Sequence, residues 1–222
     1  MVRILCTKQL SITDIQAFTQ AGFSIETIDF IQILPFSDFD HISDFEYGIF
    51  TSTNALSALI QNPAYQDIPC RKAFCVGEKT QKVLQENGWE VIASFPYASL
   101  LASYLVENFP QASMAFFCGD KRLDTLPHTL KEHQIPFQEI QTYQTLLIPK
   151  HLETSFEALL FFSPSAVESF LMENTFGSEK IICIGTTTQK ALPKGIESFL
   201  ADTPTLRGMR DCCIRIFKPF LE

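Results

Sequence analysis

The chain has 222 residues and a formal net charge of −8, with 17 basic side chains against 25 acidic ones. This length suffices for one large domain or two small ones, and a hydrophobic fraction of 46% is enough to build a full core. An acidic chain argues against a nucleic-acid groove, because such a groove needs a basic surface. We therefore expect no nucleic-acid partner.

Seven cysteines are spread along the chain, without a C-x-x-C motif. An odd number in this pattern favours reduced thiols over a disulfide framework or a zinc knuckle, and the four scattered histidines predict no metal site. The N-terminus lacks the basic and apolar segments of a signal peptide, and no apolar run approaches the ~20 residues of a membrane helix. The sequence therefore predicts a cytoplasmic protein without a membrane contact or a bound metal.

Short apolar runs alternate with amphipathic segments along the whole chain. A strand–helix–strand unit is predicted over residues 2–30, followed by an irregular segment at 35–46. Five further strands are then predicted at 47–50, 72–76, 90–95, 114–118 and 137–144. The helix expected at 99–108 should turn an apolar face toward the core, made of Leu100, Leu101, Tyr104 and Leu105. Such alternation indicates parallel α/β sheets.

The stretch 183–192 occurs in a similar form at 75–84, which is 108 positions earlier. Each copy is typical of a buried strand end, a glycine turn and the start of a helix, where free N–H groups can bind an anion. A second pair, 160–167 and 49–56, has an offset of 111, and two similar offsets in the same order indicate a duplication. The C-terminal copy lacks counterparts of the strands predicted at 114–118 and 137–144. The strand–helix–strand unit at the N-terminus supplies them.

The duplication predicts an α/β fold of two five-stranded domains. One comprises residues 1–34 and 149–222, and the other comprises residues 37–143. The chain crosses between them at 35–36 and 144–148. The cleft between two such domains is the expected ligand site.

A series of short motifs resembles the uroporphyrinogen-III synthase family. The motifs are residues 49–52, 116–122 with 126–127, 143–145, 161–165 and 184–188. Each is weak alone, but together they span nearly the whole chain in the family's order. Two departures, Thr186 and Thr53-Asn54, stand where the family often has proline.

The resemblance implies two flavodoxin-like, three-layer α/β/α domains with swapped connectivity, joined by a two-stranded linker. It also implies a lyase without a cofactor, which cyclises linear hydroxymethylbilane to uroporphyrinogen III in heme biosynthesis, with inversion of ring D and loss of water. The substrate carries many carboxylates and closes unaided to the uninverted isomer. The enzyme must therefore hold one reactive conformation and exclude the other.

Hydroxyls at helix starts, a glycine turn and two cations can hold such carboxylates. The predicted substrate-binding residues are Ser52, Thr53, Thr80, Gly119, Lys121, Arg122, Ser163, Ser165, Thr187 and Thr188. Each serine or threonine could equally be an ordinary N-cap, and each cation part of a solvated face.

Tyr143 is the predicted catalytic residue, because a phenol can donate a proton or a hydrogen bond to the departing hydroxyl. The alternative interpretation is that Tyr143 is an ordinary half-buried tyrosine of a strand, without a catalytic role. Two other functions stay open, namely a non-enzymatic two-domain module that binds a small anion and an α/β transferase for a phosphorylated ligand. The absence of Walker and Rossmann loops weakens the latter. We expect a monomer, because no stripe of exposed apolar residues stands out.

Overall fold

The computed structural model describes residues 1–37, 42 and 44–218. They fall into two compact units. Unit 1 comprises Met1–Gln32 and Leu146–Glu222, and unit 2 comprises Ile33–Thr145. Each unit has its own sheet and its own core.

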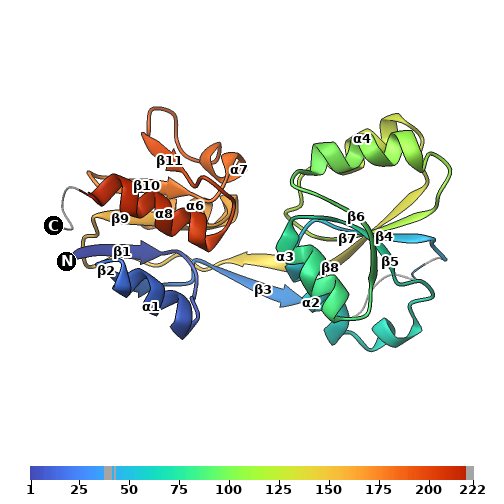
Figure 1. The fold of residues 1–222 in the computed structure, drawn as a ribbon, viewed down its shortest axis with the longest axis horizontal. Helices are drawn as coiled ribbons and strands as arrows, with labels where there is room; N and C mark the ends of the chain where they lie inside the picture. Colours follow the sequence, from blue (N-terminus) through green and yellow to red (C-terminus); the bar gives the residue numbers. More distant parts are fainter. Residues whose placement is uncertain (38–41, 43, 219–222) are drawn as a thin grey trace. The chain divides into compact units, whose positions relative to one another are not determined.

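Unit 1 is built on a five-stranded sheet that combines both ends of the chain. The strand order is β11-β10-β9-β1-β2, and all pairs are parallel. The strands are β1 (Val2–Cys6), β2 (Phe23–Thr27), β9 (Ala158–Phe161), β10 (Lys180–Cys183) and β11 (Ser198–Leu200). Figure 1 shows β1 beside β9, so the N-terminal strands complete a sheet whose other strands come from the C-terminal part of the chain.

Both faces of the sheet are buried at its centre, which explains why β9 and β10 are nearly continuous apolar runs. Ile4 and Cys6 of β1 pack with residues of α1 (Ile12–Gln20) and α8 (Leu206–Phe217). Leu5, between them, points to the other face and joins the cluster under α6 (Pro164–Leu171). A fourth helix, α7 (Thr186–Gln189), follows β10.

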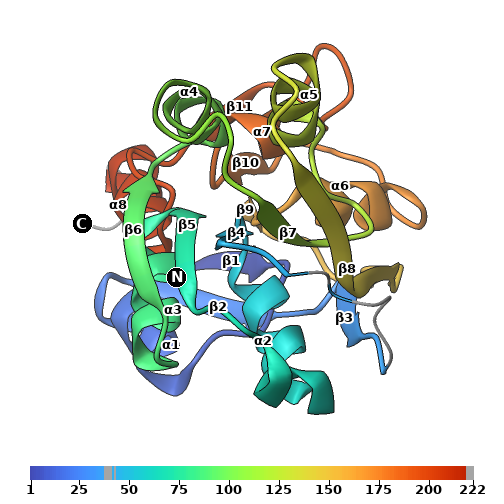
Figure 2. The same ribbon diagram turned by 90° about the vertical axis from the view of Figure 1, so that its right-hand side faces the viewer.

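Unit 2 has a six-stranded sheet in the order β3-β8-β7-β4-β5-β6. Its strands are β3 (Ile31–Pro35), β4 (Tyr47–Phe50), β5 (Lys72–Val76), β6 (Glu90–Phe95), β7 (Met114–Gly119) and β8 (Phe137–Leu147). In Figure 2, α4 (Ala98–Asn108) and α5 (Thr125–Glu132) lie on one side of the sheet, and α2 (Thr53–Gln61) and α3 (Glu78–Glu86) on the other. A short 3-10 helix, η1 (Pro63–Asp67), follows α2.

The sequence predicts five strands for this sheet, and that number is wrong because β3 adds a sixth. The Ile148 N–H donates to the Phe30 carbonyl at 3.0 Å, and the Phe36 N–H donates to the Thr142 carbonyl at 2.9 Å. Residue numbers rise along β3 as they fall along β8, so the two strands are antiparallel. Of the predicted irregular segment 35–46, residues 38–41 and 43 lie outside the described residues.

The prediction that Leu100 faces the core is also wrong. Leu101 and Leu105, four residues apart on α4, are buried, whereas Leu100 is 48% exposed. Four residues are close to one full helical turn, so Leu101 and Leu105 share a face and Leu100 lies beside it. The pattern thus located the helix but assigned too wide an apolar face.

Candidate functional site

The predicted site residues all lie at or near the carboxyl ends of parallel strands, where open α/β sheets bind their ligands. In unit 2 they follow β4, β5 and β7, and Tyr143 lies on β8 beside the end of β7. In unit 1 they follow β9 and β10. The structure thus gathers each group at one edge of its own sheet.

Tyr143 lies directly against the last residue of β7. The register between β7 and β8 shifts at this point, because Cys118 pairs with Gln141 but Gly119 pairs with Tyr143. An added Cβ on Gly119 would lie 2.3 Å from Cζ of the Tyr143 ring. Gly119 therefore contacts the tyrosine itself, a role that differs from the anion-binding turn expected for it.

The Tyr143 hydroxyl is set among polar groups at the start of α2. Burial raises the pKa of Tyr143 above its ordinary value of 10.0, while hydrogen bonds from the side chains of Ser52 and Asn54 lower it. The nearby Asp120 carboxylate adds to the increase. The phenol thus stays protonated at neutral pH and can act as a donor.

Ser52 caps α2, since its Oγ accepts the Asn54 N–H at 3.1 Å. Ser52 and its neighbour Thr53 are half-buried. A serine that caps a helix uses a lone pair for the cap and keeps its own proton for another acceptor. This cap therefore does not exclude a contact with a ligand.

The two predicted cations differ in their surroundings. Arg122 is half-buried and pairs through Nε with Glu139 Oε2 at 2.6 Å. Its Nη1 also binds Asp124 Oδ1. Lys121 is exposed. Arg122 is thus committed to two carboxylates of its own unit, which neutralise its charge locally.

Corresponding threonines in the two copies of the repeated stretch are both buried. Thr80 in α3 is 5% exposed, and Thr188 in α7 is 3% exposed. By contrast, Thr187 is exposed. Gly77 has a φ of 87°, which favours glycine, whereas Gly185 is extended with a φ of −167°. The turns that precede the two helices therefore differ in backbone conformation.

The edge of unit 1 repeats the serine cap. Ser163 Oγ accepts the Ala166 N–H at 3.2 Å at the start of α6, and Ser165 is half-buried in the first turn. Lys8, just beyond β1, places Nζ 4.2 Å from the centre of the Phe162 ring. Lys8 was not predicted as a site residue.

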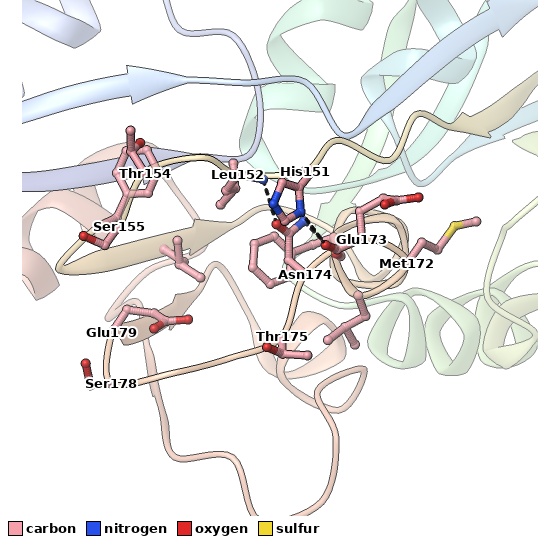
Figure 3. Close-up of a pocket in the computed structure, with 14 residues that line it drawn as sticks. His151, Leu152, Thr154, Ser155, Met172, Glu173, Asn174, Thr175, Ser178 and Glu179 are labelled. Carbon is pink, nitrogen blue, oxygen red and sulfur yellow. Dashed lines mark hydrogen bonds between the residues drawn. The ribbon is translucent and has the colours of Figure 1, made fainter.

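Unit 1 also contains a cavity of about 520 Å³ at the amino edge of its sheet. It lies among the segments before β9 and β10, where Figure 3 shows His151, Glu173 and Asn174 close together. Asn174 Oδ1 accepts the Leu152 N–H at 2.9 Å and fixes this wall. No predicted site residue is among its described lining, and the carboxylates of Glu173 and Glu179 at the cavity would repel a polyanion.

A sequence model of the family described as uroporphyrinogen-III synthase HemD matches residues 14–211. The chain belongs to the uroporphyrinogen-III synthase family. This confirms the resemblance predicted from the motifs, and it supports an enzyme of heme biosynthesis. The non-enzymatic binding module is not favoured.

Two solved structures share the fold of this family member. Uroporphyrinogen-III synthetase from Helicobacter pylori is 23% identical, with a TM-score of 0.67 over 97% of this chain and 100% of that one. A mutant uroporphyrinogen III synthase from the extremely thermophilic bacterium Thermus thermophilus is 17% identical, with a TM-score of 0.64 over 99% of this chain and 100% of that one. In the described part of the chain, no helix is long and apolar enough to cross a membrane.

Proposed function

We propose that this member of the uroporphyrinogen-III synthase family cyclises hydroxymethylbilane to uroporphyrinogen III, with inversion of ring D and loss of water. The family match over residues 14–211 carries the proposal. The arrangement of Tyr143, Ser52 and Gly119 at one sheet edge supports it, because it offers a protonated phenol beside a second hydroxyl.

Tyr143 assists the first step in this proposal. The C–O bond of the hydroxymethyl group breaks, the electron pair leaves with the oxygen, and the phenol protonates it to give water. The substituted α-carbon of ring D then attacks the resulting electron-poor azafulvene, and the spiro intermediate fragments and recloses with that ring inverted. The proton lost when the macrocycle becomes neutral again restores the phenol. Water is then the only product besides uroporphyrinogen III.

The remaining residues are proposed to hold carboxylates. Ser52, Thr53, Ser163 and Ser165 offer hydroxyls and N–H groups at the starts of α2 and α6. Thr187 is exposed and follows a glycine turn, and Lys121 adds a positive charge.

The proposal assigns a smaller part to three predicted residues. Thr80 and Thr188 are proposed to support the helix starts rather than to contact the substrate, because both residues are buried. Arg122 is proposed to order the turn after β7 through its bond to Glu139. The finer expectations also stay proposals: a lyase of the hydro-lyase type, a cytoplasmic monomer, flavodoxin-like domains with swapped connectivity, and the domain ranges given above.

The test mixes the purified protein with freshly generated hydroxymethylbilane, oxidises the products and separates them by isomer. We expect the inverted isomer to dominate and to form well above the rate of the protein-free blank. The Gln9→Ala variant, altered in a loop of unit 1, is purified and assayed in the same way as a control. If only the uninverted isomer forms, at the blank rate, the proposed function is wrong.

A further inference from the structure

Neighbouring residues hold the chain on both sides of Tyr143. Before it, the buried Thr142 hydroxyl donates to the Cys118 carbonyl at 3.3 Å. After it, the Thr145 N–H donates to Asp120 Oδ1 at 2.8 Å. The Asp120 N–H in turn donates to the Tyr143 carbonyl at 3.2 Å. Bonds to the end of β7 and to Asp120 just after it therefore hold the Tyr143 backbone directly and on either side.

The register shift determines where the Tyr143 side chain points. Thr142 is the additional residue, because Gln141 and Tyr143 pair with two consecutive residues of β7. A bulge of this kind bends its strand and redirects the side chain that follows. Without the additional residue, the next side chain in β8 would exchange one face of the sheet for the other.

Gly119 provides the space for the ring. A Cβ at this position would lie 2.3 Å from Cζ, 2.5 Å from Cε2 and 2.8 Å from the hydroxyl oxygen of Tyr143. Gly119 is not among the glycines with positive φ in the described chain. Glycine is therefore needed here for close approach rather than for an unusual backbone conformation.

We propose that Thr142 and Gly119 are a pair of positioning residues that hold the Tyr143 phenol at one place beside the end of β7. Thr142 sets the direction of the side chain through the bulge, and Gly119 sets how closely the ring approaches the strand. Thr142 has no exposed surface and Gly119 is buried, so both act through the tyrosine. The inference rests on the proposed function, which needs a donor at a fixed distance from the departing oxygen.

The first test is the Gly119→Ala variant. The added methyl group must push the ring aside, so we expect kcat to fall about 10- to 100-fold, as for loss of the proton donor itself. KM should change little, because the carboxylate-holding groups are untouched. In the Tyr143→Phe background, Gly119→Ala should lower kcat by less than about twofold more, because two changes that act through one group are not additive.

A second readout does not depend on turnover. NMR of ring-labelled tyrosine follows the phenol titration, and the Tyr143 resonance is the one that the Tyr143→Phe variant lacks. Displacement exposes the ring, so its pKa should fall toward the ordinary value in Gly119→Ala. If the wild-type chain makes no uroporphyrinogen III, the proposed function is wrong, and this titration still decides whether Gly119 positions the ring.

Thr142 supplies a matched pair of variants that add no bulk. Thr142→Val removes the hydroxyl but keeps the branched shape, and Thr142→Ser keeps the hydroxyl. We expect Thr142→Val to lower kcat about tenfold and to shift the Tyr143 pKa, and Thr142→Ser to restore both. If Gly119→Ala does not fold, this pair alone decides. Unchanged kcat and an unchanged Tyr143 titration in the folded variants would overturn the proposal.

Discussion

A central strand pair of each unit can be compared at the residue pair that lies three positions before the capping serine, here called the common level. Beyond this level the two units differ. Cys6 of β1 pairs with Leu160, three residues before the capping Ser163. Phe116 of β7 pairs with Ile49, likewise three residues before the capping Ser52. From this common level β1 ends at once, whereas β7 continues for three more residues to Gly119.

The extension is what places Tyr143. Counted from the common level, Gln9 corresponds to Gly119. Gln9 ties its loop to β2, because its N–H donates to Asp29 Oδ1 at 2.9 Å and its Oε1 accepts from the Thr27 hydroxyl at 2.9 Å. At this edge of its sheet, unit 1 therefore has a loop that is tied to β2, whereas unit 2 has the bulge in β8 and the Tyr143 side chain. In the proposed function, the helix starts shared by both units hold carboxylates, and Tyr143 beside the end of β7 assists the departure of the hydroxyl.

The largest expected effect comes from filling the space under the tyrosine. Gly119→Val should lower turnover by more than about 100-fold, because a misplacement of even about 1 Å can cost that much. The corresponding change in unit 1, Gln9→Ala, should leave turnover within about twofold, since Gln9 ties a loop. Isomer-resolved turnover of both variants measures the difference. Equal losses of turnover in the two variants would show that the corresponding edges of the two sheets do not differ in role.

Removing only the donor should have a smaller effect. Tyr143→Phe keeps the ring and its contact with Gly119 but loses the proton. We expect turnover to fall about 10- to 100-fold, the lower range for a general acid, with little change in KM. Steady-state kinetics with freshly generated substrate measures both quantities. Turnover close to that of the wild type would remove Tyr143 from the mechanism.

Alkaline stability should affect both units together, because both bury thiols in their sheets. Burial raises the pKa of Cys6, Cys118 and Cys183 from 9.0 to about 12. In the unfolded chain these thiols ionise near pH 9, while in the folded chain they stay neutral. Their contribution to the free energy of unfolding is thus complete below pH 9 and is lost as the pH rises toward 12.

Urea unfolding between pH 8 and pH 10.5 measures this loss. Tryptophan fluorescence reports on unit 2 through Trp89, which lies in one of its core clusters. Circular dichroism reports on both units. We expect the midpoint urea concentration to fall with rising pH by both signals, and a midpoint that does not change would contradict the burial of the thiols.

The smallest effects concern the two serine caps. Ser52→Ala and Ser163→Ala should each destabilise the protein by about 1 kcal/mol, because each removes an N-cap. Only Ser52→Ala should change the Tyr143 titration, and it should raise the pKa further, since the Ser52 hydrogen bond lowers it. Thermal unfolding and tyrosine NMR measure the two quantities. A raised Tyr143 pKa in Ser163→Ala would contradict this separation.

The sequence was sufficient for features that depend on local pattern. Buried parallel strands are apolar runs, and the serines before α2 and α6 mark helix starts, so the repeat could be recognised from residues alone. β3 was missed because Ile31–Pro35 forms the edge of its sheet and is only partly buried. An edge strand lacks the apolar run of its buried neighbours.

The rest depends on contacts between distant residues. The bulge at Thr142 requires both β7 and β8, and one strand read alone shows no additional residue. The partner of Arg122 is Glu139, 17 positions away on a different element. The burial of Thr188 follows from the orientation of α7, which has four residues and so too few to show a helical period.

The sheet of unit 1 also sets an order of events during synthesis. Its first strand pairs with β9 across 154 positions, from Ile4 to Ala158, while unit 2 is one uninterrupted stretch of chain. A ribosome therefore completes unit 2 before β9 has been made. Until then β1 and β2 expose apolar faces and an open edge. The nascent chain is most open to aggregation during that interval, through the first thirty or so residues rather than through the part that carries Tyr143.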